Sequence, residues 1–273
     1  MPSTSSLRRV TCIAFLVFSI VALPFSASAA AIELTSSLKA SLDKTAVAAD
    51  TKTGAALREL YAEFGSQLQA DKDAAANIKA LQYRNEEAAI LLRKQIRDID
   101  AARVGRLAAE VQQAKTRYKP LFDGYTALNK QVALAKSLKN KTLSSVLGIQ
   151  AQAMKLSVQL AREDIKKKDA AHKAAKTAAS AKIKAARDSL AAIDPLKVQI
   201  KALRSGLSST RSGLSPVWAN FKYALKKNDA GSARQALASL VAGVKTIVSQ
   251  QNKIYALEKR ISDVISATKT RYL

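Results

Sequence analysis

The chain has few of the residues that build metal sites, disulfides and sheets. Its 273 residues include one cysteine, one histidine, one tryptophan, nine glycines and five prolines. A single cysteine and a single histidine exclude a zinc, iron–sulfur or disulfide framework within one chain. The low glycine and proline content, with few β-branched clusters, argues against a sandwich, a barrel or a nucleotide-binding α/β fold. The remaining composition, 48% hydrophobic and rich in alanine, predicts an all-α protein.

The first thirty residues have the features of a secretory signal peptide. Arg8 and Arg9 precede an apolar run over residues 10–23, and small residues follow up to Ala29. We expect residues 1–29 to be removed; the alternative is a retained N-terminal membrane anchor. The mature protein is then expected to be secreted, extracytoplasmic and associated with the cell surface.

Apolar residues recur every three or four positions along two segments of similar length, residues 53–118 and 125–193. This spacing predicts two long helices, each with an apolar stripe. A proline and an Asp-Gly pair lie between them, so we predict an antiparallel helical hairpin that turns at residues 119–124. Opposed residues would then have numbers that sum to about 243, which places Ile78 near Ile165. The alternative is one kinked helix that pairs with another chain.

The regions outside this hairpin have weaker or shorter patterns. Residues 30–52 form a lead-in segment, residues 53–194 the hairpin, and residues 195–273 a C-terminal bundle of shorter helices. Within the last unit, helix starts are predicted at Pro216 and after Asp229, because proline suits the first helical turn and aspartate caps helix N-termini.

Positive charge is concentrated in the C-terminal part of the chain. The sequence has 45 Lys and Arg against 21 Asp and Glu, a formal net charge of +24. Residues 31–110 hold 12 of each sign, whereas residues 111–273 hold 31 basic against nine acidic residues. The densest block lies between residues 166 and 187, and we predict that it binds a polyanion, because such charge concentrates anionic polymers at a surface. Its basic residues are Lys166, Lys167, Lys168, Lys173, Lys176, Lys182, Lys184 and Arg187.

The alternative is that this block is an ordinary solvated helix face, partly neutralised by internal acids. Pairs four residues apart, such as Asp164 with Lys168, contribute to neutralisation. The predicted hairpin register also sets four acidic residues roughly opposite the block: Glu59, Glu63, Asp71 and Asp73.

Residues suited to catalysis are scarce, so we expect a protein that is not an enzyme and that uses no cofactor or metal. A hydrolase needs a base near a nucleophile, or a metal with several ligands. His172 is the only imidazole, lies on a predicted stripe, and is flanked by lysines. The neighbouring carboxylates Glu86 and Glu87 are adjacent in sequence, and adjacent helical residues do not share a face.

The long stripes expose more apolar surface than one chain easily covers, so we expect a homo-oligomer or a helical partner protein. Asn85 and Gln251 lie on the stripes, where polar residues are expected to fix helix register.

In its Lys/Ala-rich helical texture the whole chain resembles the coiled-coil-like proteins that Gram-positive bacteria secrete. Together, these features predict a non-enzymatic protein of the cell envelope whose basic C-terminal half binds anionic polymers or partner proteins. The expected ligand is an anionic cell-wall polymer or an anionic lipid surface, and non-specific nucleic acid would satisfy the same charge. Alternatives are an extracytoplasmic holdase chaperone and, ranked lower, a helical pore-forming toxin.

Overall fold

The chain folds almost entirely into helices over the residues that the structure, a computed structural model, describes. These are residues 32–273, so the expected signal peptide lies outside the described part. The prediction of an all-α protein is confirmed, since residues 32–273 contain no strand. The six helices are α1 (Ser36–Ala48), α2 (Thr51–Arg97), α3 (Ala101–Ser137), α4 (Lys141–Ala191), α5 (Ile193–Lys226) and α6 (Ala230–Tyr272).

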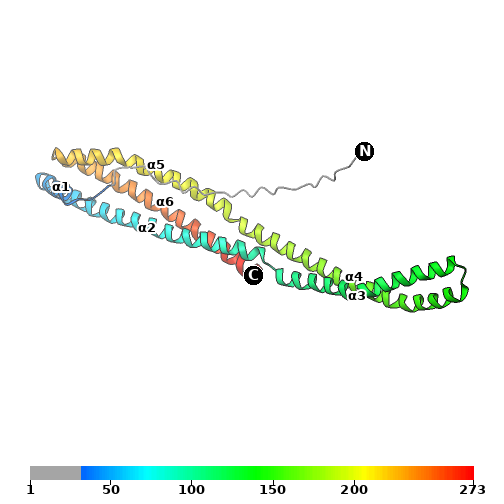
Figure 1. Ribbon diagram of the computed structural model, residues 1–273. Helices are drawn as coiled ribbons and strands as arrows, with labels where there is room; N and C mark the ends of the chain where they lie inside the picture. The colour runs from blue at the N-terminus through cyan, green and yellow to red at the C-terminus, as the bar shows by residue number, and fades with distance from the viewer. Residues whose placement is uncertain (1–31) are drawn as a thin grey trace, which may run out of the picture.

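Four of these helices form one long antiparallel hairpin (Figure 1). Helices α2 and α3 run out to the far end of the molecule, and α4 and α5 return. The turn consists of residues 138–140, where Lys139 has a left-handed backbone with φ 56°. Asn140 then caps α4, because its side-chain oxygen accepts a hydrogen bond from the Leu143 N–H at 3.0 Å. At 1.5 Å per residue, the outgoing limb is roughly 130 Å long.

The hairpin is therefore present, but its expected turn and register are wrong. The Tyr118 hydroxyl donates to Asp164 at 3.2 Å, and Lys182 lies 3.3 Å from Asp100. Both pairs sum to 282 rather than to about 243. Ile78, expected near Ile165, packs instead in a core formed with α5 and α6.

The reason for the shifted turn is that α3 continues through Pro120. Proline removes one helical hydrogen bond and crowds the carbonyl four residues earlier. Here Pro120 and Thr116, the residue whose carbonyl is affected, are both exposed, so water can hydrate that carbonyl. Pro216 likewise lies inside α5 rather than at a helix start. The predicted cap at Asp229 is confirmed, since its carboxylate accepts a hydrogen bond from the Ser232 N–H at 3.0 Å.

Each limb is interrupted once where the arm joins the bundle, and the two breaks are offset along the hairpin, since Asp100 lies level with Lys182. On the outgoing limb, Asp100 has a left-handed backbone with φ 55° between α2 and α3. On the returning limb, Ala192 separates α4 from α5, with Asp194 in the first turn of α5. These breaks divide the molecule into a two-helix arm, α3 and α4, and a bundle that contains α2, α5 and α6.

In the bundle, α6 lies between the two limbs and runs parallel to α2 (Figure 1). Glu63 contacts Lys245, and Asn85 contacts Glu258, so residue numbers rise together along both helices. A core in the middle of the molecule joins α2, α4, α5 and α6 through residues such as Ile96, Leu190 and Ile261. This core therefore contains residues from both sides of residue 195, where the C-terminal unit was expected to begin.

A second core lies at the end of the bundle that is distant from the arm. Phe64, Trp218 and Phe221 form an aromatic cluster in which the ring centroids of neighbouring residues lie 6.0 and 5.6 Å apart. Leu42 of α1 packs into the same core. Gly54 allows α1 to approach α2, because a Cβ at this position would collide with the backbone carbonyl of Ala46.

Buried polar side chains link the three bundle helices. Asn85 donates from Nδ2 to the backbone carbonyl of Glu258 at 2.8 Å and to its carboxylate at 2.9 Å. One carboxylate oxygen of Asp71 accepts from Arg211 at 2.6 Å and from Gln251 at 2.7 Å. Because each bond joins a specific pair across helices, a shift of register would leave these groups unpaired.

The arm has a much thinner core than the bundle. The fully buried positions between α3 and α4 are small: Val111, Ala114, Ala135, Ala151, Val158, Ala161, Ala175 and Ala179. Alanine and valine bury less apolar area than the leucine, isoleucine and aromatic residues of the bundle, so they stabilise the arm less.

We therefore expect backbone amides of the arm, residues 104–180, to exchange with deuterium at least about tenfold faster than those of residues 237–261 in α6. Local opening of the arm separates two helices only, whereas opening of α6 disrupts both cores. Hydrogen-exchange mass spectrometry on the native protein measures both regions in one sample. Equal protection of the two regions would contradict this expectation.

Candidate anion-binding surface

The arm carries most of the excess positive charge. Residues 101–191 hold 19 Lys and Arg against six Asp and Glu, a net charge of +13. The remainder of residues 32–273 has 24 basic against 15 acidic residues, a net charge of +9. The arm is thus the more strongly charged part, although it has fewer residues.

All eight residues of the predicted basic block lie on α4, but they do not share one face. Seven have exposed side chains, and Lys168 is half-buried. Four of the eight have a carboxylate oxygen within 4 Å: Lys168 contacts Asp164 (3.1 Å), Lys173 contacts Asp169 (2.7 Å), Lys182 contacts Asp100 (3.3 Å), and Lys184 contacts Asp188 (2.9 Å).

The eight residues point in different directions around α4, according to their positions in the helical turn. The seam is the row of α4 positions that are buried against α3, and the residues directly after these positions fall on one flank of α4. Five of the predicted residues lie there, whereas Lys167, Lys168 and Lys182 point in other directions around the helix. Two residues outside the predicted block, Lys155 and Arg162, continue the same flank and are exposed. We call this set the basic stripe: Lys155, Arg162, Lys166, Lys173, Lys176, Lys184 and Arg187.

Lys155 and Arg162 lie outside the predicted block, because that block was defined by the density of charge along the sequence rather than by helical phase. Lys155 lies seven residues before Arg162, and Arg162 lies four residues before Lys166, and this spacing is the signal that identifies them. From Lys155 to Arg187 the stripe is about 48 Å long. Its length suits an extended ligand rather than a compact one.

The acids beside the stripe remain ionised over most of the pH range. The hydrogen bond from Lys173 holds the pKa of Asp169 below its ordinary value of 3.8, against the opposing effect of burial, and the charge of Lys115 on α3 acts in the same direction. The hydrogen bond from Lys168 is the main cause that lowers the pKa of Asp164. These carboxylates therefore neutralise their lysines in part, but five stripe residues have no carboxylate within 4 Å among residues 32–273.

The acids expected opposite the block lie elsewhere. Glu63 contacts Lys245 on α6, and Asp71 contacts Arg211 on α5. The expected neutralisation from α2 is wrong, because the true register sets α3, not α2, against this part of α4. The opposite helix segment, α3, holds only Glu110 and Asp123 as acids.

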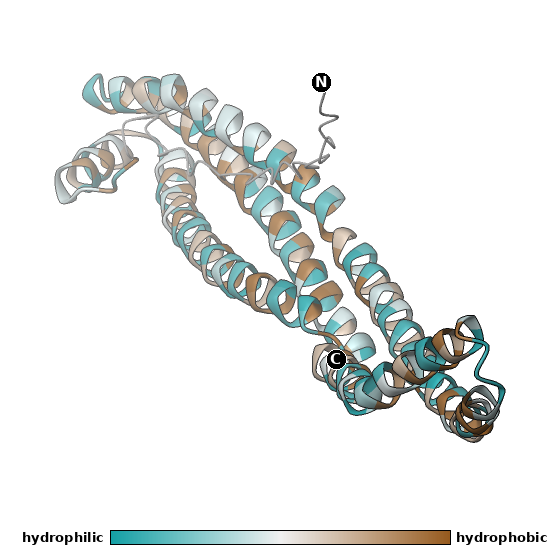
Figure 2. Cartoon of the chain, turned by 45° about the vertical axis from the view of Figure 1, so that its right-hand side comes forward, coloured by the Kyte–Doolittle hydropathy of each residue, from teal (hydrophilic) through white to brown (hydrophobic). Residues whose placement is uncertain are grey.

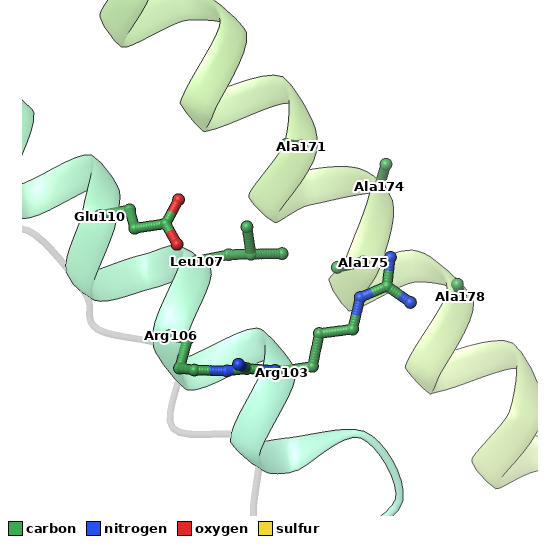
Figure 3. Close-up of a pocket in the computed structure, with 8 residues that line it drawn as sticks. All are labelled: Arg103, Arg106, Leu107, Glu110, Ala171, Ala174, Ala175 and Ala178. Carbon is green, nitrogen blue, oxygen red and sulfur yellow. The ribbon is translucent and has the colours of Figure 1, made fainter.

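A shallow groove of about 570 Å³ lies on another side of the arm (Figure 3). Four alanines of α4 form one wall, and Arg103 extends toward Ala175 and Ala178 from α3. Glu110 lies beyond Leu107 and makes no ion pair with the groove arginines among the described residues. The groove offers exposed guanidinium groups, so it adds positive potential to the arm without enclosing a ligand.

Groups suited to metal binding do not gather within residues 32–273, where no cluster of three or more His, Cys, Asp or Glu side chains is found. His172 is half-buried on α4, next to the stripe. None of the helices over residues 32–273 is apolar enough for long enough to cross a bilayer.

No family model, curated protein sequence or solved structure matches the chain.

Proposed function

We propose that this is a secreted, non-enzymatic helical protein of the cell envelope whose basic stripe binds anionic polymers. The observation that carries the proposal is the alignment of seven exposed Lys and Arg residues along one flank of α4 over about 48 Å. One positive side chain about every 8 Å favours a ligand whose anionic groups also repeat along a chain.

The adjoining helix strengthens this surface. Lys115 of α3 lies close enough to Asp169 to lower the pKa of that carboxyl, which places a further positive charge beside the stripe. Because the ion pairs along the stripe are exposed, they contribute little and are screened by salt, so an incoming anion can replace the carboxylates as partner. Sequence-specific reading of nucleic acid is not expected, because aromatic side chains do not accompany the stripe.

Retention of the protein on purified cell walls, with and without extraction of teichoic acid, tests the proposal. We expect retention that falls steeply as NaCl rises, because each neutralised anionic group releases counterions. We also expect extraction of the acid polymer to abolish retention. Retention that is unaffected by this extraction would contradict the proposed ligand.

A charge-matched pair of variants locates the binding surface. The stripe variant replaces five residues without an ion pair with glutamine: Lys155, Arg162, Lys166, Lys176 and Arg187. We expect the slope of log affinity against log salt to fall by about four, since up to five contacts are lost. The control variant removes three lysines and two arginines from exposed positions of the bundle and keeps the slope: Lys201, Arg234, Lys253, Lys259 and Arg260. Equal slopes in the two variants would show that net charge, not the stripe, determines binding.

Measuring binding at increasing salt concentrations also distinguishes a holdase chaperone from the proposed polyanion-binding protein. A holdase that binds unfolded proteins through apolar contacts would show modest salt dependence. Steep salt dependence favours the polyanion ligand.

A further inference from the structure

The free end of the arm carries a concentration of exposed aliphatic side chains. Of the fifteen large hydrophobic residues that are exposed in residues 32–273, seven lie within residues 134–160. Their exposed fractions range from 46% to 70%. We call this set the apolar tip: Leu134, Leu138, Leu143, Val146, Ile149, Leu156 and Leu160. Figure 2 shows hydrophobic segments on both helices at this end of the molecule.

On α4 the apolar tip forms a second stripe, separate from the seam. Val146, Ile149, Leu156 and Leu160 follow spacings of three, seven and four residues, so they share one outward face. The seam residues Ala151 and Val158 are buried against α3 and lie largely on the opposite face. A helix that is apolar on two faces needs a partner on each, and α3 covers only one.

The charge of the residues around the apolar tip indicates which kind of partner would cover it. Residues 124–162 contain no Asp or Glu, but they contain six basic residues: Lys130, Lys136, Lys139, Lys141, Lys155 and Arg162. Three of them, Lys136, Lys139 and Lys141, surround the turn itself and are exposed. The partner must therefore offer apolar material together with negative charge.

We propose that the apolar tip inserts into the interface of an anionic lipid bilayer. An amphipathic helical segment binds there with its apolar side chains at the boundary between headgroups and acyl chains, while lysines contact anionic headgroups. A second copy of the tip is disfavoured, because it would bring six further positive charges and no acid to the contact. Insertion is limited to the interface, since no helix in residues 32–273 can span the membrane.

This proposal adds a second surface to the proposed function. Its aliphatic residues lie outside the basic stripe, although Lys155 and Arg162 belong to the stripe and also flank the apolar tip. Polymer binding requires repeated charge along the flank of α4, whereas lipid insertion requires the aliphatic residues near the turn. The two surfaces can therefore be disabled separately, and the failure of one is distinguishable from the failure of the other.

A site-specific label tests the insertion directly. Residues 32–273 contain all six helices and no cysteine, so one introduced cysteine carries an environment-sensitive dye. We expect the dye on Val146→Cys to shift to the blue on vesicles of phosphatidylcholine with phosphatidylglycerol, and not on phosphatidylcholine alone. The control Val198→Cys, an exposed valine of the bundle, should show no shift on either vesicle.

A matched pair of triple variants tests the contribution of the aliphatic side chains. Replacing Leu138, Val146 and Ile149 with glutamine should weaken binding to the anionic vesicles at least about tenfold in a flotation assay. The control replaces Leu91, Val198 and Ile90, three exposed bundle residues of the same types, and should change affinity less than about twofold. Circular dichroism of both variants checks that helix content is retained.

Four results would overturn the proposal. The first is an unchanged dye signal at Val146, and the second is equal affinity of the two triple variants. The third is a dimer in solution that the tip variant, but not its control, converts to a monomer, because the tip would then bind a second copy. If the stripe variant alone abolished vesicle binding, the lipid contact would belong to the stripe and not to the tip.

Discussion

Replacing Phe221 with alanine is expected to lower the free energy of unfolding by about 4 kcal/mol. The Phe221 side chain is fully buried at 0% exposure, in a core that also contains Trp218 and apolar residues of α6. The substitution removes a whole ring from the core that joins α1, α2, α5 and α6, and the helices can only partly close the cavity. This loss is a large share of the stability of an ordinary domain.

Urea unfolding measures the effect, with circular dichroism for helix content and the single tryptophan as a local probe. Trp218 belongs to the same core, so its fluorescence reports the part of the bundle where the cavity forms. The control is Tyr223→Ala, which removes an aromatic ring from an exposed position of the same helix. It should cost less than about 1 kcal/mol. Similar losses in the two variants would show that Phe221 does not anchor the core.

A second large effect is expected at the buried polar contact between α2 and α6. Asn85→Leu should destabilise the protein by about 3 kcal/mol, because it leaves the Glu258 carboxylate buried without its amide donor. Glu258 is only 4% exposed, and Asn85 donates to both its backbone carbonyl and its carboxylate. Water therefore has little access to replace the lost hydrogen bonds.

The double variant Asn85→Leu with Glu258→Leu distinguishes a lost hydrogen bond from a simple packing defect. Removing both partners also removes the unpaired acceptor, so the double variant should be at least about 1.5 kcal/mol more stable than Asn85→Leu alone. Denaturant unfolding of the wild type, both single variants and the double variant completes the cycle. Additive losses would contradict the assigned pairing.

Phe221 and the contact between Asn85 and Glu258 both lie in the bundle. Helices α2, α5 and α6 contribute to both cores, whereas α1 contributes to one and the end of α4 to the other. The arm has an alanine-rich seam and carries the basic stripe and the apolar tip. The large apolar cores therefore lie in the bundle, whereas the arm carries exposed basic and aliphatic side chains.

Residue spacing was sufficient to predict the helices, the antiparallel hairpin and the polar stripe positions Asn85 and Gln251. Helical periodicity is a local property, and each stripe shows which face of its helix is covered. The dense basic block was also visible, since charge along a helix is read directly from the residue types. The extension of this block to Lys155 and Arg162 follows from their positions around the helix, which place them on the same flank as Lys166.

The partner of each stripe and the position of the turn depended on the whole assembly of helices. Pro120 and Gly124 are strong breakers in sequence, yet α3 passes through both on its exposed side. The actual turn at residues 138–140 has a weaker signal in the sequence. In the structure, Lys139 adopts a positive φ there and Asn140 caps α4. An apolar stripe shows that one face of a helix is buried, but it does not show which helix covers that face. The predicted hairpin paired α2 with residues of α4, whereas in the structure α2 packs against α6. Helix pairing is decided by the sum of many side-chain contacts over the full length, and for that reason the acids of α2 pair in the bundle and the lysines of α4 remain exposed.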